Sequence, residues 1–270
     1  MSLFLTSRLL SAAGVAHGFS LREGGVSVGP LASLNLGESV GDSPEAVTEN
    51  HRRLRQAAGL EADFATVHQV HGDRIVDARG REVLAGTQPE SRDSRDSRDS
   101  HESGGGADGV LALEPGQVVG IRVADCAPIL LYDEEGGAAA AVHSGWRGSR
   151  LAIAARGVRA LQHAAAADPR RMLAAIGPCI GRCCYEVSAE LATGFRSLFG
   201  PEAADDPAQV AKPHLDLRFC VASALLQAGL ASERIEQVAR CTSCDSGAFF
   251  SHRRDKGRTG RHLAFIAAGP

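Results

Sequence analysis

Two residues that can do chemistry lie close together in the segment 118–148. Cys126 stands between apolar runs at 118–123 and 129–132, and His143 follows a third run at 138–142. Such runs, bounded by glycine and acidic residues, predict buried strands, and Pro128 marks a strand end or bulge because it cannot donate to the ladder. A thiol and an imidazole at neighbouring strand ends can form a nucleophile–base pair, hold a metal ion, or simply belong to the core. These two residues alone leave all three interpretations open.

Two further histidines, His68 and His71, lie between strand-like runs in the segment 64–77. In an extended chain these two side chains point to opposite faces. We therefore expect at most one of them to face a given site. Taken singly, each is more often structural than functional.

Several polar residues have the character of ligand contacts. One arginine follows the third apolar run in a turn bounded by glycines, and two more lie in a basic loop with glycines at 257 and 260. Arginines in such loops suit phosphate or carboxylate. An arginine and an asparagine also occur in the Gly- and Ser-rich region 14–42, where a solvated hairpin is the alternative. These candidates are Arg22, Asn35, Arg147, Arg253 and Arg254.

The elements that must position these residues can be read from capping and periodicity. A helix is expected over 43–58, with Ser43 as N-cap, Pro44 at the first position and Gly59 as the stop. Residues 145–148 predict a tight turn, with a helix beginning near Ser149. Further helices are expected at about 151–168, after an N-cap at 188, and over 217–228, and further strands at 172–176, 235–239 and 262–267.

Composition excludes several classes of protein. The net charge is −3, from 29 basic and 32 acidic residues, which gives no electrostatic footprint for nucleic acid. The first residues lack the basic leader of a secretion signal, and no apolar run reaches the length of a membrane span. The chain has seven cysteines, and this odd number argues against a disulfide framework. We therefore expect a cytoplasmic protein with reduced thiols.

The cysteines also raise the question of a structural zinc site. The motif Cys241-x-x-Cys244 could combine with Cys179, Cys183 and Cys184. These spacings fit the known structural zinc motifs poorly, and consecutive cysteines point in different directions in most backbones. The sequence therefore disfavours this second site.

Residues 88–106 form a low-complexity insertion that contains three Arg-Asp-Ser repeats and ends in three glycines. Alternating charge without apolar residues cannot bury a core, so a disordered surface loop is expected. Strand-like sequence resumes at once with Ala107-Asp108-Gly109-Val110-Leu111, so the loop is not a domain boundary.

Five motifs occur together in an order and spacing that resembles one family: HQVHG, ADCAPILLYD, VHSGWRG, IGPCIGRCCYEV and CTSCDSGAFFSHRRDKGRTGR. On these motifs, and on FSLREGGVSVGPLASLNLGESVGD near the N-terminus, the chain resembles the YfiH family. This family is also called the laccase-domain, multicopper polyphenol oxidase or peptidoglycan editing factor family. The resemblance covers nearly the whole chain. It implies an α+β (mixed α/β) fold with layered mixed β-sheets flanked by helices, in a single domain over residues 1–270.

The resemblance also implies a metal held by three residues: His71 of QVHG, Cys126 of ADC and His143 of HSGWRG. Two imidazoles, a thiolate and an open fourth position make a sensible catalytic zinc site. Copper has also been associated with the family. The only methionines are Met1 and Met172, with none near the three ligands, and the chain lacks the many histidines of a multicopper cluster. Zinc is therefore the expected ion.

The activity that the resemblance implies is phosphorolysis of adenosine, inosine, guanosine or methylthioadenosine, together with deamination of adenosine. A metal that activates water can support attack on a purine carbon, and the arginines can hold phosphate or ribose. Three alternatives stay open. They are a copper-dependent polyphenol oxidase, a cysteine hydrolase of peptidoglycan precursors with Cys126 as nucleophile and His143 as base, and a non-catalytic binding protein.

Overall fold

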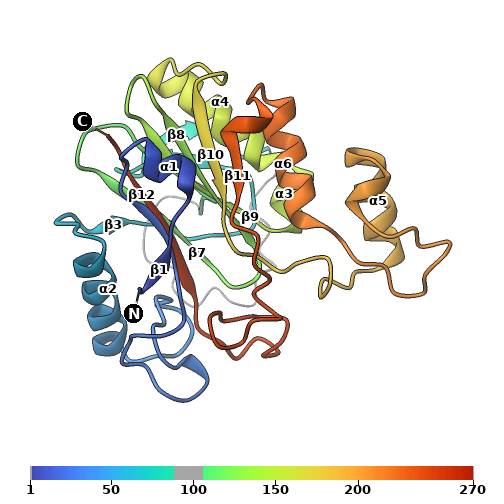
Figure 1. The fold of residues 1–270 in the computed structure, drawn as a ribbon, viewed down its shortest axis with the longest axis horizontal. Coiled ribbons are helices and arrows are strands. Elements are labelled where there is room, and N and C mark those ends of the chain that lie inside the picture. The colour runs from blue at the N-terminus through green and yellow to red at the C-terminus, as the bar shows by residue number, and fades with distance from the viewer. Residues whose placement is uncertain (1, 88–105, 270) are drawn as a thin grey trace.

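The computed structural model describes residues 2–87 and 106–269. The insertion expected at 88–106 therefore lies, apart from its last residue, outside the described residues. Two mixed β-sheets form the centre of the fold and helices cover their outer faces (Figure 1). The predicted α+β class is confirmed.

One sheet has five strands in the order β1-β2-β12-β7-β3. The strand β12 (His262–Ala267) pairs antiparallel with both β2 (His17–Ser20) and β7 (Val118–Val123). The short strands β1 (Phe4–Leu5) and β3 (Phe64–Ala65) form its edges. The last strand of the chain thus lies at the centre of this sheet, between its first and middle segments.

The second sheet has seven strands in the order β11-β10-β8-β9-β6-β4-β5. Its centre is the antiparallel pair β8 (Ala127–Asp133) and β9 (Ala139–Ser144). On one side follow β10 (Met172–Ile176) and β11 (Ile235–Gln237), and on the other β6 (Gly109–Ala112), β4 (Ile75–Asp77) and β5 (Glu82–Leu84).

Alternation along the strands creates two core layers. In β8, Ile129 and Leu131 pack toward the helices, whereas Leu130 packs with Val119 and Ile266 between the two sheets. Because side chains alternate with a period of two, fully apolar strands are needed wherever both faces are covered. This explains why the strand-forming runs of this sequence lack the usual polar positions.

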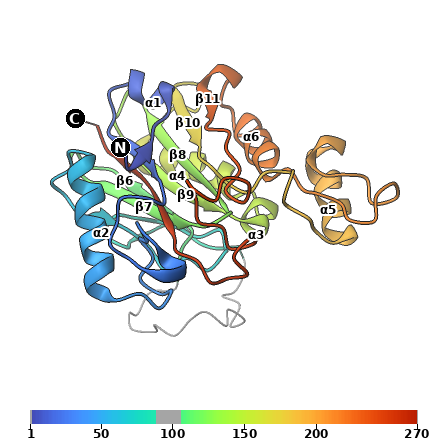
Figure 2. The same ribbon diagram turned by 60° about the horizontal axis from the view of Figure 1, so that its bottom comes forward.

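The helices cover the outer faces of both sheets. Two of them, α4 (Ile153–Ala165) and α6 (Leu217–Gln227), pack on the seven-stranded sheet, and α2 (Pro44–Ala57) packs on the five-stranded sheet through Leu54. The helix α1 (Arg8–Ala12) inserts Leu10 between the sheets. The helix α5 (Ala189–Phe199) is set apart at one side of the molecule (Figure 2) and has a small core of its own around Phe195.

Most elements lie where the sequence predicts them, with one clear correction. The segment expected to be a turn at 145–148 is instead the first part of α3 (Trp146–Arg150), with Gly145 as its N-cap. The caps Ser43 and Ser188 do accept hydrogen bonds from the first turns of α2 and α5. Over residues 2–87 and 106–269, no helix is both long and apolar enough to cross a membrane.

Candidate metal centre

The three predicted ligands meet at one end of the seven-stranded sheet. Each of His71, Cys126 and His143 offers a donor atom within 4.8 Å of the others. A tetrahedral zinc ion with Zn–S about 2.3 Å and Zn–N about 2.0 Å needs donors about 3.5 Å apart. Two imidazoles and a thiolate suit a borderline to soft metal ion, so the donor set fits the expected metal.

Strand register brings two of these ligands together. His143 lies in β9 opposite Pro128 of β8, and Cys126 comes directly before β8. Gly145, just after β9, leaves room for the sulfur, because a Cβ at this position would lie 3.0 Å from Cys126 Sγ and 3.3 Å from His71 Cδ2. The glycine is therefore required by close approach, since its φ of −83° is one that any residue adopts.

A buried carboxylate positions the third ligand. The backbone N–H groups of Val70, His71 and Gly72 donate to Asp108, with N–O distances of 3.2, 3.0 and 2.7 Å. His71 has a left-handed φ of 60°, so this segment curls around the carboxylate instead of extending. As a result His68 and His71 line the same cleft, contrary to the expectation that they would point to opposite faces.

Asp108 also orients His143. The Nδ1 of His143 donates to Asp108 Oδ1 over 2.7 Å, and the Asp108 side chain is fully buried. With Nδ1 engaged, Nε2 is the nitrogen left to bind a metal. A carboxylate behind a metal-binding imidazole fixes its tautomer and increases its basicity. The sequence predicts Asp108 only as part of a strand, and its place directly before β6 is the one local sign of its role.

Cys126 and His143 shift each other's pKa values. Burial raises the pKa of the Cys126 thiol, but the adjacent imidazoles of His143 and His71 outweigh it and lower this pKa to about 6. Burial lowers the pKa of His143, but the Cys126 sulfur and Asp108 raise it well above its ordinary value. The site therefore favours the thiolate, which is the form that binds metals and attacks carbon.

A cleft of about 580 Å³ opens over the three donors. Among the residues that line it are both Arg147 and Arg253. Each guanidinium lies over an aromatic ring, Arg147 over Trp146 at 4.7 Å and Arg253 over Tyr185 at 5.1 Å. A second cleft of about 630 Å³ adjoins it and shares His71, Trp146 and Arg147. The structure thus brings two of the predicted arginines to the metal ligands.

The other three predicted contacts are engaged elsewhere and do not line this cleft. Arg254 donates to the carbonyls of Thr242 and Phe249 and pairs with Asp255. Arg22 donates to the carbonyl of Ala32. The fully buried Asn35 bonds Gly37 and Asp42. The hydrogen bonds of these three residues hold loops together. This is a structural role, in place of the substrate contact that the sequence predicts for them.

Several cleft residues had no distinct signal in the sequence. Tyr185 and Trp146 offer aromatic surface, while Arg122 of β7 and His252 and Arg261 of the basic loop also line the cleft. Only the fold shows that these side chains line one cleft. Asp125, with a left-handed φ of 88°, anchors two loops of this wall by accepting from Thr242 Oγ1 at 2.6 Å and from the Arg253 N–H at 2.6 Å.

The family model described as "Multi-copper polyphenol oxidoreductase laccase" matches residues 16–269. The chain is 36% identical over 260 residues to "Purine nucleoside phosphorylase YlmD" of Geobacillus stearothermophilus, covering 94% of this chain and 90% of that protein. It is 35% identical over 257 residues to "Purine nucleoside phosphorylase YfiH" of Escherichia coli, covering 94% of this chain and 93% of that protein.

Solved structures agree with these sequence matches. The crystal structure of the hypothetical protein YfiH of Bacillus licheniformis superposes with a TM-score of 0.84 at 30% identity, covering 99% of this chain and 97% of that chain. The structure of YlmD from Geobacillus stearothermophilus gives 0.81 at 32% identity, with both chains fully covered. The chain therefore belongs to the YfiH family.

Proposed function

We propose that the protein is a zinc-dependent purine nucleoside phosphorylase that acts on adenosine, inosine, guanosine and methylthioadenosine, and that it also deaminates adenosine. The observation that carries this proposal is the His71, Cys126 and His143 cluster on a cleft with two arginines on its walls. A nucleoside needs a concave site with a few convergent polar groups, and its co-substrate phosphate needs cations. The names of the relatives in Geobacillus and Escherichia support the same activity.

Three side chains would hold the zinc ion, and a zinc ion bound there would act as a Lewis acid toward the substrate. Asp108 keeps the His143 ring fixed with its Nδ1 as donor. Arg147 and Arg253 would bind phosphate or ribose through charge-assisted hydrogen bonds. The ring of Tyr185, at the same wall, lies under the Arg253 guanidinium and would hold it beside the substrate by a cation–π contact.

Zinc is favoured over copper by what surrounds the ligands. Blue-copper sites combine two histidines and a cysteine with a weak axial methionine. Within residues 2–87 and 106–269 the one methionine is Met172, which is buried in the core layer under the helices. This supports a zinc-binding phosphorylase over the copper-dependent polyphenol oxidase that the family model's description suggests. Oxygen uptake with a phenol would reverse this choice.

A second candidate function rests on a different part of the same geometry. Asp108 contacts His143, and His143 contacts Cys126. An acid that orients a base, next to a thiol nucleophile, is the arrangement of cysteine hydrolases. Such an enzyme would act without metal on a peptidoglycan precursor. His71 argues against it, because a hydrolase does not need a second imidazole against the thiolate, whereas a metal site needs the third ligand.

The deciding experiment is incubation of the purified protein with adenosine, with and without phosphate and chelator, and separation of adenine from inosine. We expect adenine to form only with phosphate and inosine to form with or without phosphate. The formation of both products should stop when chelator is present. Cys126→Ala and His143→Ala should abolish both products but leave a folded protein, because so large a core does not depend on one ion. A covalent adduct at Cys126 in metal-free, active protein would establish the hydrolase, and a protein without any turnover would be a binding protein.

The setting of this activity follows from composition. We infer a cytoplasmic enzyme, because all seven cysteines are unpaired thiols. The net charge of −3 gives no electrostatic footprint for a nucleic-acid partner. The match over residues 16–269 supports the prediction of one domain over the whole chain.

A further inference from the structure

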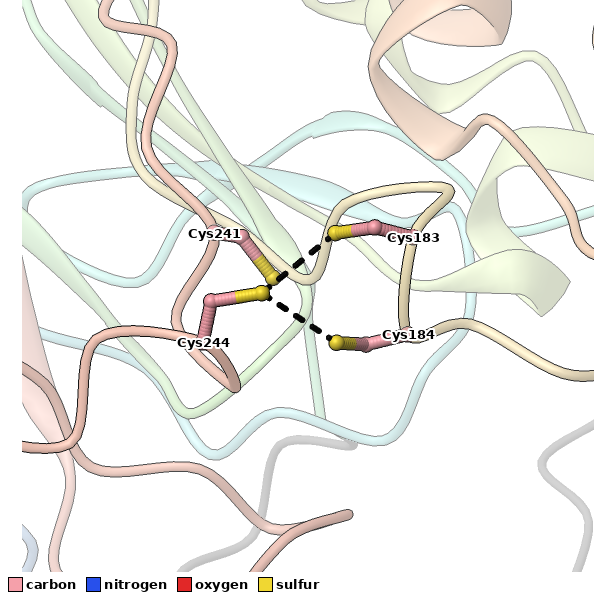
Figure 3. Close-up of side chains that lie close together, drawn as sticks. All are labelled: Cys183, Cys184, Cys241 and Cys244. Carbon is pink, nitrogen blue, oxygen red and sulfur yellow. Dashed lines mark hydrogen bonds between the residues drawn. The ribbon is translucent and has the colours of Figure 1, made fainter.

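Four cysteines outside the cleft form a second cluster (Figure 3). Cys183 and Cys184 come from the turn after β10, and Cys241 and Cys244 from the turn after β11. Their four sulfur atoms all lie within 4.8 Å of one another. The Sγ of Cys244 lies 3.5 Å from that of Cys183 and 3.4 Å from that of Cys184.

The fold itself brings these two turns together. β10 and β11 are parallel, so the segments that follow them leave the sheet at the same end. The pairing continues past the strand ends as a bridge between Cys179 and Cys241, with Cys179 N–H donating to Arg240 O and Thr242 N–H to Cys179 O. The cluster therefore does not rest on surface loops that meet by chance.

A tight turn lets two consecutive cysteines face the same point. The N–H groups of Cys184 and Tyr185 both donate to Gly181 O, at 2.9 and 3.1 Å. This curvature is why the expectation that Cys183 and Cys184 would point apart is wrong here. Gly181 is also the residue that leaves space for the sulfurs, because a Cβ on it would lie 3.2 Å from Cys183 Sγ and 3.3 Å from Cys241 Cβ.

A backbone N–H group points at one of the four sulfur atoms. The N–H of Gly181 donates to Cys241 Sγ over 3.2 Å. Backbone N–H groups aimed at sulfur are a means of stabilising the charge that metal binding requires. Cys183 and Cys244 are exposed, which leaves a path for an ion to enter.

We propose that Cys183, Cys184, Cys241 and Cys244 bind one zinc ion as a structural site. Four thiolates around zinc at about 2.3 Å are about 3.8 Å apart, which is close to the separations seen here. With four protein ligands the site is closed, so it has no open position for a substrate. It is distinct from the candidate catalytic centre, and the proposal does not depend on the proposed enzymatic activity.

The consequence of this ion would be a fixed wall of the substrate cleft. Cys184 is followed by Tyr185, whose ring lies under Arg253. Cys241 is followed by Thr242, which donates to Asp125 next to Cys126. Joining the two turns through one metal therefore holds both a cleft side chain and the loop that carries Arg253.

Elemental analysis of the full chain, purified anaerobically with zinc and reductant, tests the proposal. Cys244→Ala and Cys184→Ala should each contain about one zinc ion fewer per chain than the wild type. Cys220→Ala, a buried cysteine outside the cluster, should lose none and serves as the matched control. Unchanged zinc in Cys244→Ala would overturn the proposal whatever the outcome for the catalytic activity.

A spectroscopic measurement covers the case in which a cluster variant fails to fold. The variant Cys126→Ala lacks a ligand of the candidate centre in the cleft, so only the four-cysteine cluster can bind cobalt through thiolates. Cobalt substitution of this variant should give the strong thiolate-to-cobalt charge-transfer absorption of a tetrahedral sulfur site. Absence of this absorption would contradict the proposal. Alkylation and mass spectrometry without reduction detect disulfides in the same anaerobic preparation. Disulfides among the four cysteines would contradict the metal site and indicate a redox-active pair.

Discussion

Asp108 is the residue on which the geometry of the metal ligands depends most. Its carboxylate accepts from three consecutive N–H groups at 70–72 and from His143 Nδ1. Burial raises the pKa of this carboxyl, but the hydrogen bonds to His143 and to the backbone lower it below its ordinary value. An amide in its place would direct an N–H₂ group at one of these donors.

We therefore predict that Asp108→Asn weakens metal binding by roughly 10- to 100-fold, the usual cost of losing a group behind a ligand. Competition with a chromophoric chelator measures this directly. Asp73→Asn is the matched control, because Asp73 is equally buried but serves Thr87 and Arg156. If both variants keep wild-type affinity, Asp108 does not position the ligands.

Arg147 and Arg253 are predicted to contact the substrate. Removing one charge-assisted contact should raise the transition-state free energy by roughly 1.5–3 kcal/mol, which is about 10- to 150-fold in kcat/KM. Arg147→Ala and Arg253→Ala should show this loss while zinc content persists. Arg258→Ala, an exposed arginine of the same basic loop as Arg253, should retain activity. Wild-type phosphate dependence in both cleft variants would remove these arginines from the site.

At the scale of elements, the junction between β9 and α3 controls the space around the ligands. A methyl group on Gly145 would lie 3.0 Å from Cys126 Sγ. We predict that Gly145→Ala lowers metal affinity by roughly 10-fold, similar to other disturbances around metal ligands, with only a small change in Tm. Gly194→Ala in α5 has nothing within 4 Å of the new atom and should stabilise that helix by about 0.5–1 kcal/mol. Equal metal affinity in the two variants would contradict the crowding argument.

The sequence predicts these elements well because each depends on local signals. The apolar runs at 118–123 and 172–176 become β7 and β10 with the same bounds, and Ser43 caps α2 as expected. The start of α3 differs from the prediction because Gly145, Gly148 and a lone tryptophan resemble a turn, whereas in the structure Gly145 is the N-cap of a helix that begins at Trp146.

The site itself could be predicted only through the family resemblance. The spacing of His71, Cys126 and His143 contains no short metal motif, and their meeting depends on strand register and on the left-handed backbone at His71. The sequence disfavours the four-cysteine cluster because consecutive side chains point in different directions in most backbones. The tight turn closed on Gly181 O turns both sulfur atoms to one point, and this turn has no distinct residue pattern in the sequence.

For the whole molecule, buried neutral histidines predict how stability depends on pH. His262 is buried, and its Nε2 accepts the Phe250 N–H at 2.8 Å, so the folded state requires the neutral ring. Burial lowers the pKa of His262 to about 3. The unfolded state, with an ordinary pKa of about 6.5, binds the proton first, so stability is present above that pH and is lost as the pH falls toward the folded pKa.

This one residue should cost about 2 kcal/mol of unfolding free energy between pH 7 and pH 5. Denaturant unfolding at both pH values, with chelator present so that metal release does not contribute, measures it. His262→Gln is less stable overall but should show a smaller difference between the two pH values. The remaining difference belongs to groups such as His17, whose pKa burial also lowers. An unchanged difference in His262→Gln would show that His262 does not titrate on unfolding.

The origin of the three proposed metal ligands in separate segments has a thermodynamic consequence. An unfolded chain does not hold His71, Cys126 and His143 within 4.8 Å of one another, so the proposed zinc ion would bind the native state far more tightly than the unfolded state. By mass action, free zinc at 100 times its Kd then adds about 2.7 kcal/mol to the stability of the fold. The Tm of this protein should therefore rise with the concentration of free zinc, and its resistance to unfolding in the cell becomes a function of how much zinc the cell holds.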